Sequence, residues 1–98
     1  MNSLHTGEEK VFKLYVENKG FLKKQLFTKL FAEYHVIDDE FSIGDLEVIF
    51  DEIVKNPKGM DLDEFRVSVQ MIADKKKTPV KAIQVILSNI KKPKTKFY

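Results

Sequence analysis

Hydrophobic residues recur along the chain at intervals of three and four, the spacing that places them on one face of an α-helix. Five such runs follow one another, and no stretch of any length alternates between apolar and polar residues as a half-buried strand does. The apolar sets are Val11, Phe12, Tyr15 and Val16; Leu22, Leu26, Phe27, Leu30, Phe31 and Tyr34; Leu46, Ile49, Phe50, Ile53 and Val54; Leu62, Phe65, Val69, Ile72 and Ala73; and Val80, Ile83, Ile86, Leu87 and Ile90. The sequence therefore predicts an all-α fold of five helices.

Polar residues and a glycine predict the limits of the first helix. Thr6 and Glu9 have the spacing of a capping box, in which the two side chains accept hydrogen bonds from backbone groups at the helix start. We expect this helix over about residues 7–18, with Gly20 after it because glycine accepts the conformation that closes many helices. The second helix is expected from Leu22 onward.

The last three helices also have start and stop signals. Ser42 is a predicted N-cap, with Asp45 placed to complement the helix dipole. Residues 56–59, Asn-Pro-Lys-Gly, are the clearest helix break, and Asp61 is the predicted cap of the helix that follows. In the pair 78–79, threonine is the predicted cap of the fifth helix and proline its first helical residue.

Composition favours a single small domain. The chain has 98 residues, of which 43% are hydrophobic, close to the lower limit for a self-sufficient core. We expect a flexible N-terminus over residues 1–6, a helical domain over 7–91 and a basic flexible tail over 92–98. There is no cysteine, so disulfides and thiolate zinc sites are excluded. No apolar run approaches the roughly 18 to 20 residues that span a bilayer, so we expect a soluble protein that is the whole mature chain.

Charge is distributed unevenly along the chain. Residues 1–73 carry 9 basic and 14 acidic side chains, whereas residues 74–98 carry eight lysines and one aspartate. Such a cationic arm attracts acidic partners by salt-sensitive contacts, or it serves only as a solubilising end. Nucleic acid and anionic lipid are further alternatives, but the absence of arginine from this segment disfavours nucleic acid. The candidate partner-binding residues are Lys75, Lys76, Lys77, Lys91, Lys92, Lys94 and Lys96.

Residues 56–65 resemble the second half of a calcium-binding EF-hand loop. Such a loop needs oxygen ligands at its positions 1, 3 and 5 and a glutamate at position 12. With Glu64 at position 12, the earlier positions fall on Ile53, Lys55 and Pro57, which supply no side-chain oxygen. In the first helix pair, positions 1, 3, 5 and 12 fall on Tyr15, Glu17, Lys19 and Leu26. One carboxylate cannot hold the ion, so we expect no calcium.

The apolar positions of both loops are nevertheless present. They are Leu22 with Phe27 in the first loop and Met60 with Phe65 in the second. In EF-hands these positions pair the two loops and pack the helices that leave them. The sequence therefore predicts paired EF-hand-like helix-loop-helix units without calcium sites.

An ordered set of short motifs resembles the core domain of the tubulin polymerization-promoting protein family over roughly residues 10–90. The segments that carry this resemblance are 27–30 (FTKL), 36–38 (VID), 41–50 (FSIGDLEVIF), 60–65 (MDLDEF) and 73–76 (ADKK). The Val-Ile-Asp triplet, followed by Asp45 and Phe50, is the most specific part.

The resemblance implies a cytoplasmic, cytoskeletal protein that binds tubulin and promotes or stabilises the assembly or bundling of microtubules. The cysteine positions proposed as zinc ligands in the family correspond to Phe31 and Tyr34, so neither zinc nor any other cofactor is expected. The family's glycine-rich C-terminal segment has no counterpart, as expected of a short divergent member. The sequence leaves the oligomeric state open.

No nucleophile elbow, phosphate-binding glycine loop or zinc spacing is present, so an enzyme is not expected. A second function remains open beside tubulin binding. Phe21 and Phe41 lie just outside the predicted helical faces and could flank a groove that holds a partner helix. The alternative is thus an ion-independent EF-hand-like adaptor.

Overall fold

The computed structural model describes residues 8–16, 20–33 and 36–89, and within these ranges the regular structure is entirely helical. The helices are α1 (Glu8–Val16), α2 (Lys24–Glu33), α3 (Ile43–Ile53), α4 (Leu62–Lys76) and α5 (Val80–Ser88). The predicted all-α fold of five helices is confirmed. The predicted cap Thr6 and the predicted flexible ends lie outside the described residues.

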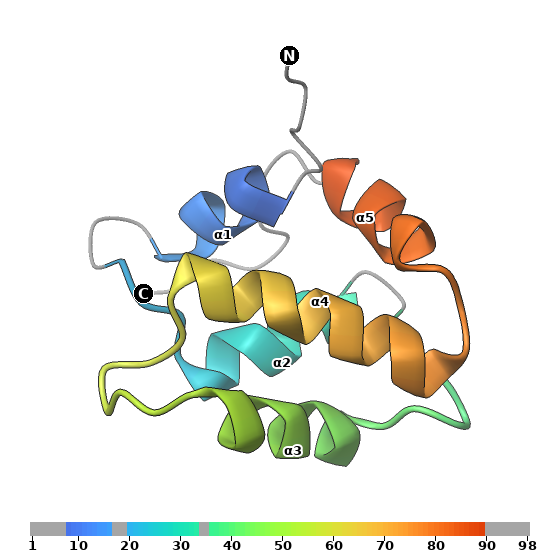
Figure 1. Ribbon diagram of the computed structural model, residues 1–98, viewed down its shortest axis with the longest axis horizontal. Coiled ribbons are helices and arrows are strands. Elements are labelled where there is room, and N and C mark those ends of the chain that lie inside the picture. Colours follow the sequence, from blue (N-terminus) through green and yellow to red (C-terminus); the bar gives the residue numbers. More distant parts are fainter. Residues whose placement is uncertain (1–7, 17–19, 34–35, 90–98) are drawn as a thin grey trace.

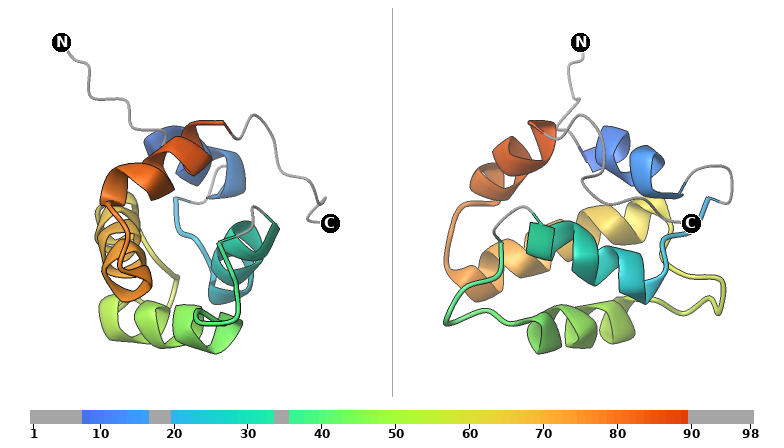
Figure 2. Two further views of the ribbon diagram at one scale, coloured as in Figure 1. Left: turned by 90° about the vertical axis from the view of Figure 1, so that its right-hand side faces the viewer. Right: turned by 180° about the vertical axis from the view of Figure 1, so that it is seen from behind.

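The longest helix, α4, crosses the front of the molecule, with α3 below it and α1 and α5 above it (Figure 1). It packs against α1, α3 and α5, while α2 packs against α3, and α1 against α5. From behind, α2 lies above α3 (Figure 2). None of the helices within the described ranges has the length and apolar character needed to cross a bilayer.

Phenylalanine rings from four helices meet in the core. Phe65 of α4 lies between Phe12 of α1, at 5.6 Å between ring centroids, and Phe31 of α2, at 6.0 Å. Phe31 also contacts Phe27 at 5.2 Å, and Phe27 contacts Phe50 of α3 at 5.6 Å. All five side chains are at most 8% exposed. The predicted apolar faces therefore meet in one continuous core.

An antiparallel bridge joins the loop before α2 to the loop before α4. The Leu22 N–H donates to the Met60 carbonyl, and the Met60 N–H to the Leu22 carbonyl, both at 2.8 Å. These are the residues predicted to pair the two loops. Because Leu22 is extended in this bridge, α2 begins at Lys24 and not at Leu22 as predicted.

Helices α3 and α4 both begin with a reciprocal cap. In α3, the Asp45 N–H donates to Ser42 Oγ at 3.2 Å and the Ser42 N–H to Asp45 Oδ2 at 2.8 Å. In α4, the Glu64 N–H donates to Asp61 Oδ1 at 2.8 Å and the Asp61 N–H to Glu64 Oε1 at 3.0 Å. The predicted caps Ser42 and Asp61 are confirmed, and each has a carboxylate partner that completes a capping box.

The end of α4 closes in a tight turn. Lys77 adopts the left-handed conformation with φ of 57°, and its N–H donates to the Asp74 carbonyl at 3.2 Å. The Thr78 N–H donates to the Ala73 carbonyl at 3.0 Å, which completes a Schellman motif. Thr78 is thus part of the end of α4, and its prediction as the cap of α5 is wrong. Pro79 occupies that position without a side-chain hydrogen bond.

We expect Lys77→Gly to stabilise the fold by about 0.5 to 1 kcal/mol, because glycine adopts the left-handed conformation without a Cβ clash. The matched variant Lys75→Gly, at an exposed position inside α4, should destabilise it by about 1 kcal/mol. Urea unfolding midpoints measure both effects. A Lys77→Gly protein less stable than the parent would contradict the assignment of strain to this turn.

Candidate partner-binding surface

The lysines predicted as partner contacts do not share one environment. Lys75 and Lys77 are exposed at the C-terminal end of α4. Lys91, Lys92, Lys94 and Lys96 lie outside the described residues.

Lys76 differs from its neighbours because its ammonium group is held inside the fold. Its Nζ donates to the Val36 carbonyl at 3.0 Å and to Asp38 Oδ2 at 2.5 Å. It also lies 5.6 Å from the ring centroid of Phe41. Only 17% of the side chain is exposed, so Lys76 fastens the segment between α2 and α3 to the end of α4. This arrangement leaves little of Lys76 for a partner to contact.

The contact with Lys76 lowers the pKa of Asp38. The side-chain hydrogen bond from Lys76 is the main cause, and the Glu40 N–H, which donates to Asp38 Oδ1 at 2.9 Å, adds to it. A lowered pKa means that the folded protein binds the proton less readily than the unfolded chain does. The stabilisation is therefore complete above the ordinary pKa of 3.8 and is lost as the pH falls through the lower value in the folded protein.

We accordingly expect Asp38→Asn to destabilise the protein at neutral pH, and the difference from the parent to shrink as the pH falls below 3.8. Urea unfolding of both proteins over a series of pH values measures this difference. A stability difference that stays constant down to strongly acidic pH would show that the ionised carboxylate is not the stabilising group.

The two phenylalanines proposed for an adaptor groove have different environments. Phe41 is 2% exposed, because the turn that joins it to Asp38 directs its ring beneath Lys76. It is a core residue and does not present its ring to a partner. Phe21 is half-buried, and Lys58 Nζ lies 5.9 Å from its ring centroid.

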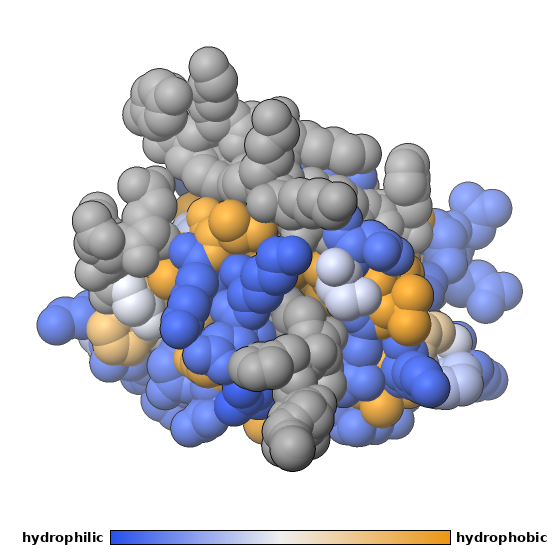
Figure 3. Space-filling view, turned by 90° about the horizontal axis from the view of Figure 1, so that it is seen from above, coloured by the Kyte–Doolittle hydropathy of each residue, from blue (hydrophilic) through white to orange (hydrophobic). Residues whose placement is uncertain are grey.

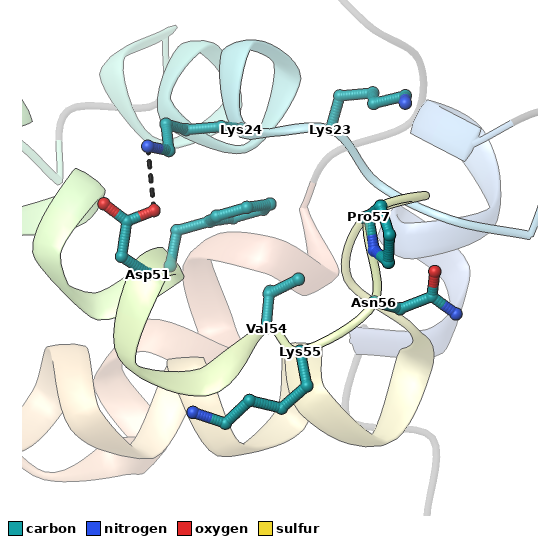
Figure 4. Close-up of a pocket in the computed structure, with 9 residues that line it drawn as sticks. Lys23, Lys24, Asp51, Val54, Lys55, Asn56 and Pro57 are labelled. Atoms are coloured by element: carbon teal, nitrogen blue, oxygen red, sulfur yellow. Dashed lines mark ion pairs between the residues drawn. The ribbon is translucent and has the colours of Figure 1, made fainter.

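A pocket of about 470 Å³ opens where α2 begins and α3 ends (Figure 4). Lys23 and Lys24 line it from the start of α2, and Asp51, Val54 and Lys55 from the end of α3 and the loop beyond. Lys24 Nζ lies 2.8 Å from Asp51 Oδ1, so an ion pair spans the two helices at the pocket. Sequence reasoning did not find this pocket, because its lysines come from segments about 30 residues apart.

Large hydrophobic side chains also reach the surface elsewhere. Ile43 and Val48 of α3, Val67 of α4 and Val85 of α5 are each about half exposed. Where the described residues are visible from above, hydrophobic patches lie beside hydrophilic side chains (Figure 3). These four residues are distributed over three helices. The basic pocket is therefore the more specific candidate for a partner-binding site.

The described residues contain no group of three or more histidine, cysteine, aspartate or glutamate side chains arranged to hold a metal ion.

In a comparison with known families, the model of the family described as p25-alpha matches residues 9–97. The chain belongs to the p25-alpha family. This is the tubulin polymerization-promoting protein family that the sequence motifs resemble, and it is a non-enzymatic, cytoskeleton-associated family. Comparisons with curated proteins and with solved structures found no match.

The segments that carry the family resemblance have structural roles here. The segment 41–50 contains the capping box of α3, and the segment 60–65 contains both Met60 of the loop bridge and the capping box of α4. The aspartate of the Val-Ile-Asp triplet, Asp38, receives the ammonium group of Lys76. These segments thus contain several residues that hold the fold together.

Proposed function

We propose that this p25-alpha protein is a non-enzymatic component of the cytoplasmic cytoskeleton that binds tubulin or microtubules. In this proposal it promotes or stabilises microtubule assembly or bundling. The observation that carries the proposal is the family match, which spans residues 9–97. The lysine-rich segment after residue 73 supports it, because the exposed tails of tubulin are acidic and attract such a segment.

We further propose that the domain is a pair of EF-hand-like units, α1 with α2 and α3 with α4, that work without calcium. The bridge between Leu22 and Met60 supports the pairing of the two loops. The Lys55 side chain supports the absence of the ion, because its ammonium group lies at the loop and donates to the Glu52 carbonyl at 3.2 Å. Ile53 and Pro57 at the other ligand positions have no side-chain oxygen.

Co-sedimentation with microtubules tests the proposed function. At low ionic strength the protein should pellet with microtubules, and added salt should release it because the contacts are between exposed charges. Replacing Lys91, Lys92, Lys94 and Lys96 with glutamine should weaken binding by about tenfold. Failure of the parent protein to pellet at low ionic strength would rule out the proposal.

Two controls accompany this experiment, one for the role of charge and one for the role of calcium. Arginine at the same four positions keeps the charge and should preserve pelleting, so a loss with arginine would point to specific lysine contacts. Calcium in place of a chelator should change neither pelleting nor the melting temperature. A shift in either at micromolar calcium would contradict an ion-free pair of loops.

The adaptor function receives no specific support. It requires two exposed aromatic side chains beside a groove, and Phe41 is buried. Retention of one specific helical peptide without tubulin binding would be the result that favours an adaptor.

A further inference from the structure

Several lysines gather in one region of the fold, although residues 1–73 carry a net negative charge. Four of the nine basic side chains of residues 1–73, Lys23, Lys24, Lys55 and Lys58, lie in the segments that form or adjoin the pocket between α2 and α3. The same residues 1–73 include 14 acidic side chains, yet among the described residues Asp51 is the one acidic side chain that lines the pocket. The described lining of the pocket is therefore positively charged, and its lysines precede the lysine-rich segment after residue 73 in the sequence.

Stability of the helices does not account for these lysines. Lys23 and Lys24 lie at the start of α2, where the positive end of the helix dipole disfavours a cation. Among the described residues, Lys23 has no ion-pair partner, and Lys55 Nζ makes a hydrogen bond only to the Glu52 carbonyl, at 3.2 Å. Two exposed ammonium groups at the pocket are thus free to pair with an anion.

The pocket also has an apolar lining. The half-buried Val54 and the exposed Pro57 provide most of it, and Phe50 adds the 8% of its surface that is exposed. Lys24 Nζ lies 5.9 Å from the centroid of the Phe50 ring while it pairs with Asp51. An incoming carboxylate can therefore replace Asp51 as the partner of Lys24, next to an apolar surface that accepts a hydrophobic side chain.

We propose that this pocket binds an acidic peptide segment of a partner protein. The carboxylates pair with Lys23 and Lys55, and an apolar side chain lies between them against Phe50 and Val54. The proposal rests on the proposed function for the partner, since the exposed tails of tubulin are acidic. Peptide is favoured over nucleic acid because the described lining of the pocket contains neither an arginine, the residue that most often reads bases, nor an exposed aromatic ring on which a base could stack.

Fluorescence anisotropy of a labelled peptide of glutamates around one phenylalanine tests the proposal with the full chain. Lys23→Gln combined with Lys55→Gln should weaken binding by about fivefold, since two exposed pairs are lost. Lys10→Gln combined with Lys29→Gln removes the same charge at exposed positions outside the pocket and should change binding by less than about twofold. Equal loss in both double variants would overturn the proposal.

A variant that is expected to bind the peptide more tightly completes the test, because a folding defect would weaken binding and could not imitate that result. Asp51→Asn removes the competing carboxylate and should tighten binding by about twofold. Replacing the peptide's phenylalanine with serine should weaken it, because Phe50 and Val54 lose their apolar partner. Weaker binding to Asp51→Asn, or tighter binding of a single-stranded oligonucleotide of the same charge, would overturn the assignment to acidic peptide.

The outcome is separable from that of the proposed function. Peptide binding that depends on Lys23 and Lys55 in a protein that does not pellet with microtubules supports the pocket and refutes tubulin as the partner. Normal pelleting by a protein that does not bind the peptide refutes the pocket and leaves the proposed function in place.

Discussion

Replacing Gly59 with alanine should destabilise the protein by about 3 kcal/mol. This loss is larger than the one expected for the same replacement at Gly20. A Cβ at this position would lie 2.6 Å from the Leu22 carbonyl oxygen and 3.0 Å from its carbonyl carbon. Leu22 cannot move away without cost, because it exchanges two hydrogen bonds with Met60 and is fully buried. The φ of 128° adds backbone strain for any residue with a Cβ.

Gly20→Ala is the matched control. Gly20 also has a positive φ, 79°, but a Cβ there would meet no atom within 4 Å. Alanine at this position should therefore cost only about 1 kcal/mol, from the conformation alone. Urea unfolding of both variants separates the cost of the close contact with Leu22 from the cost of the positive φ. Equal losses would show that the close approach to Leu22 does not limit the second loop.

Phe31→Ala should remove about 3 to 5 kcal/mol, a large share of the stability expected of a small domain. Phe31 is fully buried, and its ring lies 5.2 Å from that of Phe27 and 6.0 Å from that of Phe65. Its removal would leave a cavity between α2 and α4 that neither ring can fill without leaving its other contacts.

Phe31→Leu separates the loss of volume from the loss of the ring. Leucine fills most of the space, so this variant should cost less than about 1.5 kcal/mol. Urea denaturation at a fixed temperature measures both variants. An alanine variant within about 1 kcal/mol of the parent would show that the helices collapse onto the vacant space. The family resemblance aligns Phe31 with a cysteine proposed as a zinc ligand, and here the side chain at this position packs in the hydrophobic core.

Local patterns predicted most of the helical structure. Spacing of three and four identified each helix, because burial on one side imposes that period on the sequence. The caps Ser42 and Asp61 were predictable since a helix start needs an acceptor within a few residues. The pairing of Leu22 with Met60 followed from the EF-hand-like arrangement of apolar positions in the two loops.

Contacts between distant parts of the chain were not predictable in this way. Lys76 looked like one of three exposed lysines, but its partner Asp38 is 38 residues away. Phe41 lies outside any helical face and is buried because the turn after Asp38 directs it beneath Lys76. Thr78 has the residue type of a helix cap, yet the closing turn of α4 already uses its N–H.

The same limitation applies to the candidate site. A count of charge along the chain pointed to the lysines after residue 73, because they are consecutive or nearly so. Lys23 and Lys55 belong to a segment with a net negative charge, and only the packing of α2 against α3 brings them to one pocket. The net charge of residues 1–73 therefore conceals the positive charge that the fold gathers at this pocket.

The capping box of α4 also bears on what the start of this helix needs in order to form. Calcium sensors change shape when a glutamate at the end of the loop ligates the ion with both oxygens. Here Glu64 Oε1 accepts the Asp61 N–H at 3.0 Å, and Asp61 Oδ1 accepts the Glu64 N–H at 2.8 Å. The first turn of α4 is therefore closed by carboxylates of the chain itself, without a contribution from any bound group.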